Sequence, residues 1–150
     1  MADKLRVVAV TDDQGVIVEN SWLVRAEAVH RQLRPNLPTD YVGRMGELFA
    51  KGAQLALVVE ASAVRCVALW RVIENTADGR RLYVDDLVSD EACRSQGAGK
   101  MMFDWLEAKA AALGCTALTL DSGVQRQRAH HFYFREGMYI ASFSFKKVLK

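Results

Sequence analysis

Two adjacent carboxylates and a glycine-rich turn follow one another closely in this chain. Asp85 and Asp86 lie in the apolar run 82–88, and Gly97 and Gly99 stand a few residues later. Glycines spaced by one residue let the main chain turn with its N–H groups exposed, and a helix that starts there adds unpaired amides and the positive end of its dipole. Such a turn predicts a phosphate-binding site. A carboxylate near it is suited to accept a proton during a reaction.

The spacing of the glycines separates three kinds of phosphate loop. A Walker A loop needs a glycine where Arg94 stands and a serine or threonine where Met101 stands. A dinucleotide fingerprint needs a small residue in place of Met102, so an oxidoreductase that uses NAD is the least supported alternative. The pattern Arg/Gln-x-x-Gly-x-Gly/Ala is met without a mismatch by Arg94, Gly97 and Gly99.

Composition limits the classes of protein that the chain can belong to. A chain of 150 residues with 51% hydrophobic residues has room for one core, so we expect a single domain over residues 1–150. A net charge of +2 gives no strong field to attract nucleic acid or a membrane. Neither a signal-peptide pattern nor a run of roughly 20 apolar residues is present. Cys66, Cys93 and Cys115 lack metal-ligand spacing. We therefore expect a cytoplasmic protein with free thiols and no metal.

The hydrophobic pattern predicts the elements that position these residues. The expected strands cover residues 5–10, 54–60, 64–73, 82–88 and 116–120, with one or two closing strands in 139–148. The expected helices cover residues 16–33, the segment between the cap Thr39 and Gly52, residues 101–113, and residues 125–136. Asp78-Gly79 predicts a hairpin, so the three central strands form an antiparallel meander. The crossover helix after the glycine turn allows strand 116–120 to lie parallel to strand 82–88.

A second motif follows in the last expected helix. Ala129, Tyr133 and Gly137 fit the pattern A-x-x-[apolar]-Y-x-x-x-G, and with the glycine turn and the order of elements the chain resembles the GNAT superfamily of acyl-CoA-dependent N-acetyltransferases. The resemblance implies an α/β (α+β) fold with a mixed, mainly antiparallel central sheet flanked by helices, and two parallel strands that splay apart at the cofactor cleft. One departure is Arg126, which stands where family members often carry asparagine.

The resemblance also implies acetyl-CoA as cosubstrate and a set of residues that bind it. The strand before the turn would contact the pantetheine arm, with the Leu87 N–H against the thioester carbonyl, and the turn would hold the diphosphate. Ser122 or Gln125 would replace the missing asparagine. The residues expected to bind the cofactor are Leu87, Val88, Ser89, Arg94, Ser95, Gln96, Gly97, Ala98, Gly99, Lys100, Ser122 and Arg126.

Two residues have implied catalytic roles. Tyr133 falls where the family places a tyrosine that faces the coenzyme sulfur, and a phenol with a pKa near 10 can protonate the leaving thiolate. Asp85 is the candidate base that accepts a proton from the amine, because alternation along a strand places Asp85 with Leu87 in the cleft and turns Asp86 to the opposite face. His130, His131, Asp86 or an oriented water are the alternatives for this role.

The expected reaction is transfer of acetyl from acetyl-CoA to a primary amine by direct attack in a ternary complex. The resemblance implies an acceptor pocket around Trp22, His30, Arg34 and Tyr41, with loops near residues 75–80. Aromatic and basic residues there would fit an acceptor with a carboxylate or phosphate, and the same residues also fit a helical core stripe and a solvated face. A small-molecule amine is the expected acceptor rather than a protein. The alternative is a module that binds acyl-CoA without turnover. The apolar segment 139–145 permits a homodimer through the C-terminal strands.

Overall fold

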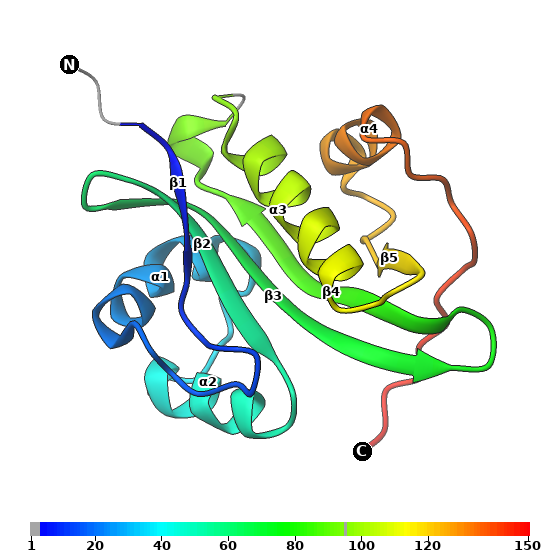
Figure 1. Ribbon diagram of the computed structural model, residues 1–150, viewed down its shortest axis with the longest axis horizontal. Helices are drawn as coiled ribbons and strands as arrows, with labels where there is room; N and C mark the ends of the chain where they lie inside the picture. The colour runs from blue at the N-terminus through cyan, green and yellow to red at the C-terminus, as the bar shows by residue number, and fades with distance from the viewer. Residues whose placement is uncertain (1–3, 95) are drawn as a thin grey trace. The chain divides into compact units, whose positions relative to one another are not determined.

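The computed structural model describes residues 4–94 and 96–150 (Figure 1). The chain divides into two compact units, Met1–Thr119 and Leu120–Lys150, and each is described by itself. The sheet has the strand order β1-β2-β3-β4-β5, and its strands are β1 Arg6–Ala9, β2 Gln54–Glu60, β3 Ala63–Asn75, β4 Gly79–Ser89 and β5 Ala117–Leu120. The first four strands pair antiparallel, and β5 runs parallel to β4. This mixed, mainly antiparallel sheet confirms the expected fold class.

Two helices pack on one face of the sheet in the first unit. They are α1 Asn20–Leu33 and α2 Tyr41–Ala50. Their buried side chains form one core with the residues of β2 that point the same way, among them Leu55, Leu57 and Val59. The cap of α2 is Asp40, whose carboxylate accepts a hydrogen bond from Gly43 N, whereas Thr39 was expected at that position.

The opposite face of the sheet is covered by helix α3, Ala98–Ala112. Trp70 of β3 meets Trp105 of α3 edge to face, with ring centroids 6.2 Å apart, while its neighbour Leu69 belongs to the core under α1 and α2. Successive residues of a strand point to opposite faces, so β3 contributes to both layers. The first unit is therefore a sheet between two helical layers, as the ribbon in Figure 1 shows.

A hairpin and a short 3-10 turn connect β4 to the elements before and after it. At one end, Asn75 pairs with Gly79 across the expected hairpin, where Gly79 has a φ of +69° that favours glycine. At the other end, a short 3-10 turn, Glu91–Cys93, leads to the start of α3. Asp90 caps this turn by accepting a hydrogen bond from Ala92 N. These connections place the glycine turn beyond the C-terminal end of the strand that carries both aspartates.

The second unit contains helix α4, Gln127–Arg135, and a C-terminal segment. Residues 138–150 form neither helix nor strand, so the expectation of closing strands in 139–148 is wrong for this structure. The side chains of Tyr139, Ile140, Phe143 and Phe145 are exposed. The apolar residues indicated a strand, but a strand also requires a partner edge for its backbone hydrogen bonds, and local sequence does not provide one.

Candidate active site

The glycine turn forms the start of α3. Gly97 has a φ of +92° and is the N-cap of the helix, with no side chain that caps it. A side chain added at Gly97 would extend into open space, because none of the described residues beyond its chain neighbours has a heavy atom within 4 Å of the Cβ position. The first hydrogen bond inside the helix runs from Met101 N to Gly97 O, so the preceding amides have no acceptor within the helix. Exposed backbone donors, the helix dipole and open space fit a phosphate group.

The charged residues of the turn add to this site. Arg94 is exposed and extended, one residue before Ser95, which lies outside the described residues. Lys100 is on the first turn of α3 and donates a hydrogen bond to Asp104, 2.9 Å away. Gln96 is exposed as well, while Ala98 is buried against the sheet. Arg94 and the amides of the turn could therefore approach a diphosphate from solvent.

A β-bulge changes the direction of the two aspartates in β4. Leu69 pairs with Asp86, but the next residue of β3, Trp70, pairs with Val84, so Asp85 has no partner residue. One extra residue interrupts the alternation of side chains across a strand. Val84 follows Trp70 toward the α3 face, whereas Asp86 follows Leu69 toward α1. The regular alternation expected along residues 82–88 is therefore interrupted at Asp85, while Asp86 and Leu87, which follow it, still point to opposite faces.

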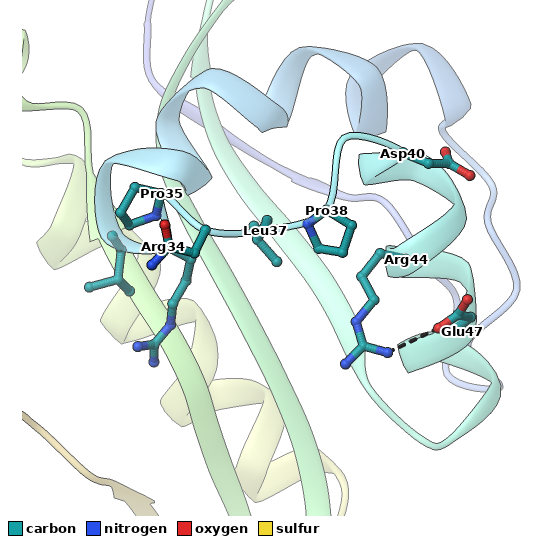
Figure 2. Close-up of a pocket in the computed structure, with 9 residues that line it drawn as sticks. Arg34, Pro35, Leu37, Pro38, Asp40, Arg44 and Glu47 are labelled. Carbon is teal, nitrogen blue, oxygen red and sulfur yellow. Dashed lines mark hydrogen bonds and ion pairs between the residues drawn. The ribbon is translucent and has the colours of Figure 1, made fainter. Parts of the chain in front are cut away.

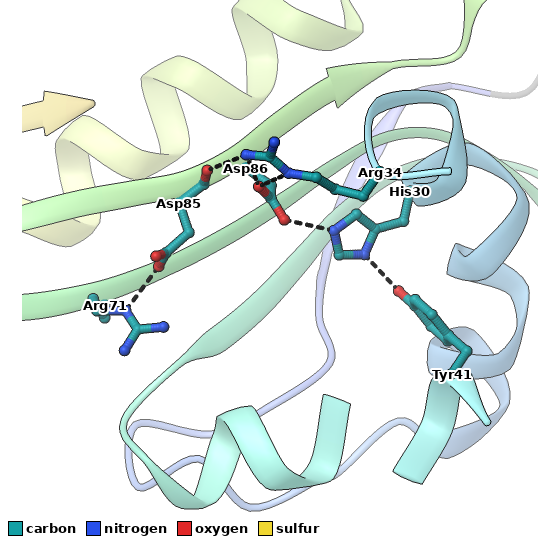
Figure 3. A network of polar contacts seen from close by, with 6 residues as sticks. All are labelled: His30, Arg34, Tyr41, Arg71, Asp85 and Asp86. Carbon is teal, nitrogen blue, oxygen red and sulfur yellow. Dashed lines mark hydrogen bonds and ion pairs between the residues drawn. The ribbon is translucent and has the colours of Figure 1, made fainter. Parts of the chain in front are cut away.

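A buried chain of hydrogen bonds links Asp86 to both helices on that face (Figure 3). The Asp86 carboxylate accepts from His30 Nε2 at 2.7 Å, and Tyr41 Oη lies 2.8 Å from His30 Nδ1. Arg34 donates to the other carboxylate oxygen from Nε at 2.8 Å and from Nη2 at 2.7 Å. His30, Tyr41 and Asp86 are all buried. Both oxygens of Asp86 are thus occupied.

The surroundings shift the acidities of these groups in different directions. Burial acts to raise the pKa of Asp86, but the hydrogen bonds from His30 and Arg34 outweigh it and hold the pKa below its ordinary value. The pKa of Tyr41 is raised, chiefly by burial and next by the charge of Glu27. Asp86 is therefore an ionised acceptor and Tyr41 a neutral phenol at neutral pH. Because a carboxylate only accepts, His30 Nε2 must be the donor in that contact.

Asp85 has a different environment from its neighbour. Its carboxylate accepts one hydrogen bond from Arg71 Nε at 2.8 Å, and its side chain is 26% exposed compared with 9% for Asp86. Burial raises the pKa of Asp85, although the hydrogen bond and the charge of Arg71 oppose that shift. A carboxylate with a raised pKa and partial exposure is a better proton acceptor than a buried carboxylate with both oxygens engaged.

A hollow of about 710 Å³ opens beside this network, along the loop between α1 and α2 (Figure 2). Arg34 is shared between the hollow and the Asp86 network. The hollow contains both charged and apolar side chains, and it is lined by Leu33, Arg34, Pro35, Asn36, Leu37, Pro38, Asp40, Arg44 and Glu47. Its volume is in the range of small-molecule sites in proteins.

The remaining predicted residues of β4 lie after the bulge. Leu87 is half-buried and pairs with Ala68, and Val88 is buried in the core with α1 and α2. Ser89 is half-buried and ends the strand opposite Cys66, whose thiol pKa is raised to about 12, chiefly by burial. These positions bring backbone groups to the end of β4, next to the glycine turn. Their contacts with a cofactor stay predictions.

Other predicted residues belong to the second unit. Tyr133 is buried on α4, 5.8 Å from the ring of Phe132. Arg126 stands at the N-terminus of α4 without a side-chain cap bond, and the Ser122 hydroxyl is buried with no hydrogen-bond partner among the described residues. His130 Nε2 lies 2.9 Å from the carbonyl oxygen of Gly123, which favours a structural role for that imidazole.

Across residues 4–94 and 96–150, no three His, Cys, Asp or Glu side chains gather in a way that could hold a metal ion. No helix in that part of the chain has the length and apolar character needed to cross a membrane.

Comparisons with known proteins agree with this architecture. The sequence model of the acetyltransferase (GNAT) family matches residues 22–138. The uncharacterized N-acetyltransferase YhdJ of Bacillus subtilis strain 168 is 36% identical over 121 residues, which cover 77% of this chain and 84% of that protein. An aminoalkylphosphonate N-acetyltransferase of Salmonella typhimurium strain LT2 is 33% identical over 66 residues, which cover 44% of this chain and 43% of that protein. The crystal structure of the aminoglycoside N-acetyltransferase AAC(6')-Iy with CoA has a TM-score of 0.84, 11% identity, and coverage of 100% of this chain and 97% of that one.

The family model and the related N-acetyltransferases identify the chain as an acyltransferase that acts on amines. The chain belongs to the GNAT acetyltransferase family.

Some residues of the site could be expected from the sequence, and others could not. His30, Arg34 and Tyr41 were expected near an acceptor pocket, and the structure brings them together around Asp86. Arg71 was missed as the partner of Asp85 because only the bulge places it there. No local signal in the sequence marks that bulge, since the extra residue is defined by pairing with a distant strand.

Proposed function

We propose that this protein transfers an acetyl group from acetyl-CoA to the primary amine of a small molecule by direct attack in a ternary complex. The observation that carries the proposal is the left-handed Gly97 at the start of α3, with open space beside it and backbone amides that have no acceptor in the helix. Acetyl-CoA would supply the activated acyl group. Family membership supports acyl transfer to amines. The class of acceptor is inferred from the residues of the site.

The cofactor would be held by main-chain groups of β4 and the glycine turn. We propose that the amides from Gln96 to Lys100, with Ser95, bind the diphosphate and that Arg94 adds a charge-assisted contact. Leu87, Val88 and Ser89 would present backbone groups to the pantetheine arm, and the Leu87 N–H would polarise the thioester carbonyl. Ser122 or Gln125 would take the place of the missing asparagine, and Arg126 would also bind the cofactor. Ser122 is suited to it because its buried hydroxyl has no protein partner among the described residues.

Asp85 is the proposed proton acceptor for the attacking amine. An ammonium has no lone pair, so the amine must lose a proton before or during attack. Asp85 has a raised pKa and a partly exposed side chain, whereas Asp86 has a lowered pKa and two engaged oxygens. Tyr133 is the proposed acid that protonates the leaving thiolate.

We propose that both units act together as one acetyltransferase domain, because the family match runs from residue 22 to residue 138 and so includes parts of each. Two copies would pair through the C-terminal segment, whose exposed apolar side chains include Phe143 and Phe145. The free thiols Cys66, Cys93 and Cys115 support a cytoplasmic location, where thiols stay reduced.

Binding and turnover of acetyl-CoA test the proposal together. Titration calorimetry should detect acetyl-CoA binding, and a thiol reagent should detect release that depends on an added amine. Gly97→Ala should weaken cofactor binding by about 5- to 30-fold, because alanine avoids the left-handed conformation that the turn needs, at a cost of roughly 1–2 kcal/mol, and its methyl group occupies the open space. Gly79→Ala is the matched control, since Gly79 also has a positive φ and open surroundings but lies in the β3–β4 hairpin. Cofactor binding without thiol release for any amine would identify a binding module instead.

A further inference from the structure

We propose that the acceptor amine also carries an oxyanion, either a carboxylate or a phosphonate, and that Arg34 binds this group. The inference rests on the proposed acetyl transfer to a small amine and names the class of that amine. It is carried by the geometry of one guanidinium, by the buried groups that support it, and by the charges around it.

Arg34 is held firmly but is not used up by its protein contacts. Nε and Nη2 donate to the same carboxylate oxygen of Asp86, at 2.8 and 2.7 Å, and Nη2 also approaches the Asp85 carbonyl oxygen at 3.4 Å. Nη1 has no partner among the described residues. The side chain is 51% exposed, and it lines the hollow between α1 and α2 (Figure 2). One edge of the guanidinium is therefore fixed, and the other is available to a ligand.

Arg34 is held by a chain of buried polar side chains, which a surface arginine does not require. Asp86 is fixed by His30, and His30 is fixed by Tyr41, with exposed fractions of 8%, 1% and 2% in that order. Burying such polar groups costs free energy even when they are paired. A side chain that is already ordered loses less entropy when it binds a ligand. The network in Figure 3 is therefore suited to pre-organise the guanidinium for binding.

The other charged groups of the hollow have partners. Asp40 accepts a hydrogen bond from Gly43 N and caps α2. Glu47 pairs with Arg44 at 2.9 Å, and this pair is largely exposed. Such exposed pairs contribute little and are screened by salt. The acidic side chains are thus engaged within α2, and Arg34 offers the pre-organised donor to a ligand in the hollow.

The arrangement around Asp85 indicates where the amine lies. Asp85 is the bulge residue, directly before Asp86, and its carboxylate is partly exposed. A short molecule with an amine at Asp85 and an oxyanion at Arg34 would match both charges. A polycation would find only Asp85 as a partly exposed carboxylate beside Arg34 and Arg71, because the Asp86 carboxylate is buried and already paired with His30 and Arg34. The site therefore favours zwitterionic acceptors over polyamines and aminoglycosides.

Steady-state kinetics with four acceptors test this inference. 2-Aminoethylphosphonate and β-alanine carry an oxyanion, propylamine lacks it, and spermidine is a polycation. We expect kcat/KM to be at least about tenfold higher for one of the two zwitterions than for propylamine or spermidine. Comparison of the two zwitterions then distinguishes a phosphonate site from a carboxylate site. Arg34→Gln should lower the ratio of kcat/KM for the preferred zwitterion over propylamine by about 10- to 100-fold, the range for one lost charge-assisted hydrogen bond.

A loss of folded enzyme lowers kcat/KM for both acceptors by the same factor, so it leaves their ratio unchanged. Arg44 lines the same hollow, and Arg44→Ala should change this ratio of kcat/KM values by less than about threefold. Arg34→Lys keeps the charge without the fork geometry and should give an intermediate ratio. Equal or better use of propylamine or spermidine by the wild type, or an unchanged ratio in Arg34→Gln, would overturn the oxyanion site and leave acetyl transfer intact. Absence of thiol release with all four amines and with a wider amine panel would instead reject the proposed function.

Discussion

Replacing Asp86 with asparagine should destabilise the protein by about 3 kcal/mol at pH 7. The carboxylate accepts hydrogen bonds from His30 at 2.7 Å and from Arg34 at 2.7 and 2.8 Å. Loss of the charge removes about 1 kcal/mol from the buried His30 contact, and about half as much from the exposed Arg34. The amide NH₂ must also oppose the donor of either His30 or Arg34, which leaves a polar group unsatisfied at a further cost of about 1–3 kcal/mol.

Urea unfolding of both proteins measures this difference, and the melting temperature should fall by roughly 6–12 °C for a chain of this size. Asp104→Asn is the matched control, because Asp104 forms an exposed pair with Lys100 and its loss should cost less than about 0.5 kcal/mol. A destabilisation of Asp86→Asn no larger than that of the control would refute the assigned role of the network.

The dependence on pH gives an independent check on Asp86. Its pKa is lower in the folded state than in the unfolded chain, where it is about 3.9, so the unfolded state binds more protons in the interval between the two values. The stability that Asp86 contributes is therefore fully present above about pH 4 and is lost as the pH falls through the folded pKa. The gap between wild type and Asp86→Asn should narrow below about pH 4. A gap of constant size from pH 7 to pH 3 would contradict the assigned direction of the shift.

The remaining predictions concern catalysis and assembly. Asp85→Asn should lower kcat/KM by about 100-fold and remove the acidic limb of its pH profile, and an unchanged profile would exclude Asp85 as the base. In the wild type, the raised folded pKa of Asp85 should lower the stability as the pH rises from about 4 through that pKa, and this effect is opposite in sign to that of Asp86. Asp85→Asn should remove this decrease in stability. Tyr133→Phe should lower kcat by at least about tenfold with little change in KM for acetyl-CoA, and full kcat would rule out the acid role. Sedimentation should show a dimer that Phe143→Ser weakens, whereas a single monomer at all concentrations would reject pairing through the C-terminal segment.

Local patterns in the sequence were sufficient to predict most of the fold. The glycine turn, the Asp78-Gly79 hairpin and the order of helices and strands depend on residues close together in the chain. Gly97 in particular could be identified because a left-handed turn before a helix favours glycine whatever surrounds it. Local patterns were not sufficient for the C-terminal segment, whose apolar residues indicated strands that the structure does not contain.

Only the tertiary structure decided how the aspartate pair is used. The sequence by itself determined that two carboxylates precede a phosphate-binding turn, since both features are local. It could not determine their directions, because the bulge at Asp85 depends on pairing between β3 and β4. Nor could it show that Asp86 bonds to His30, 56 residues away, or that Arg71 holds Asp85. Burial raises the pKa of Asp85, whereas hydrogen bonds from distant residues lower that of Asp86, and both causes exist only after the chain has folded.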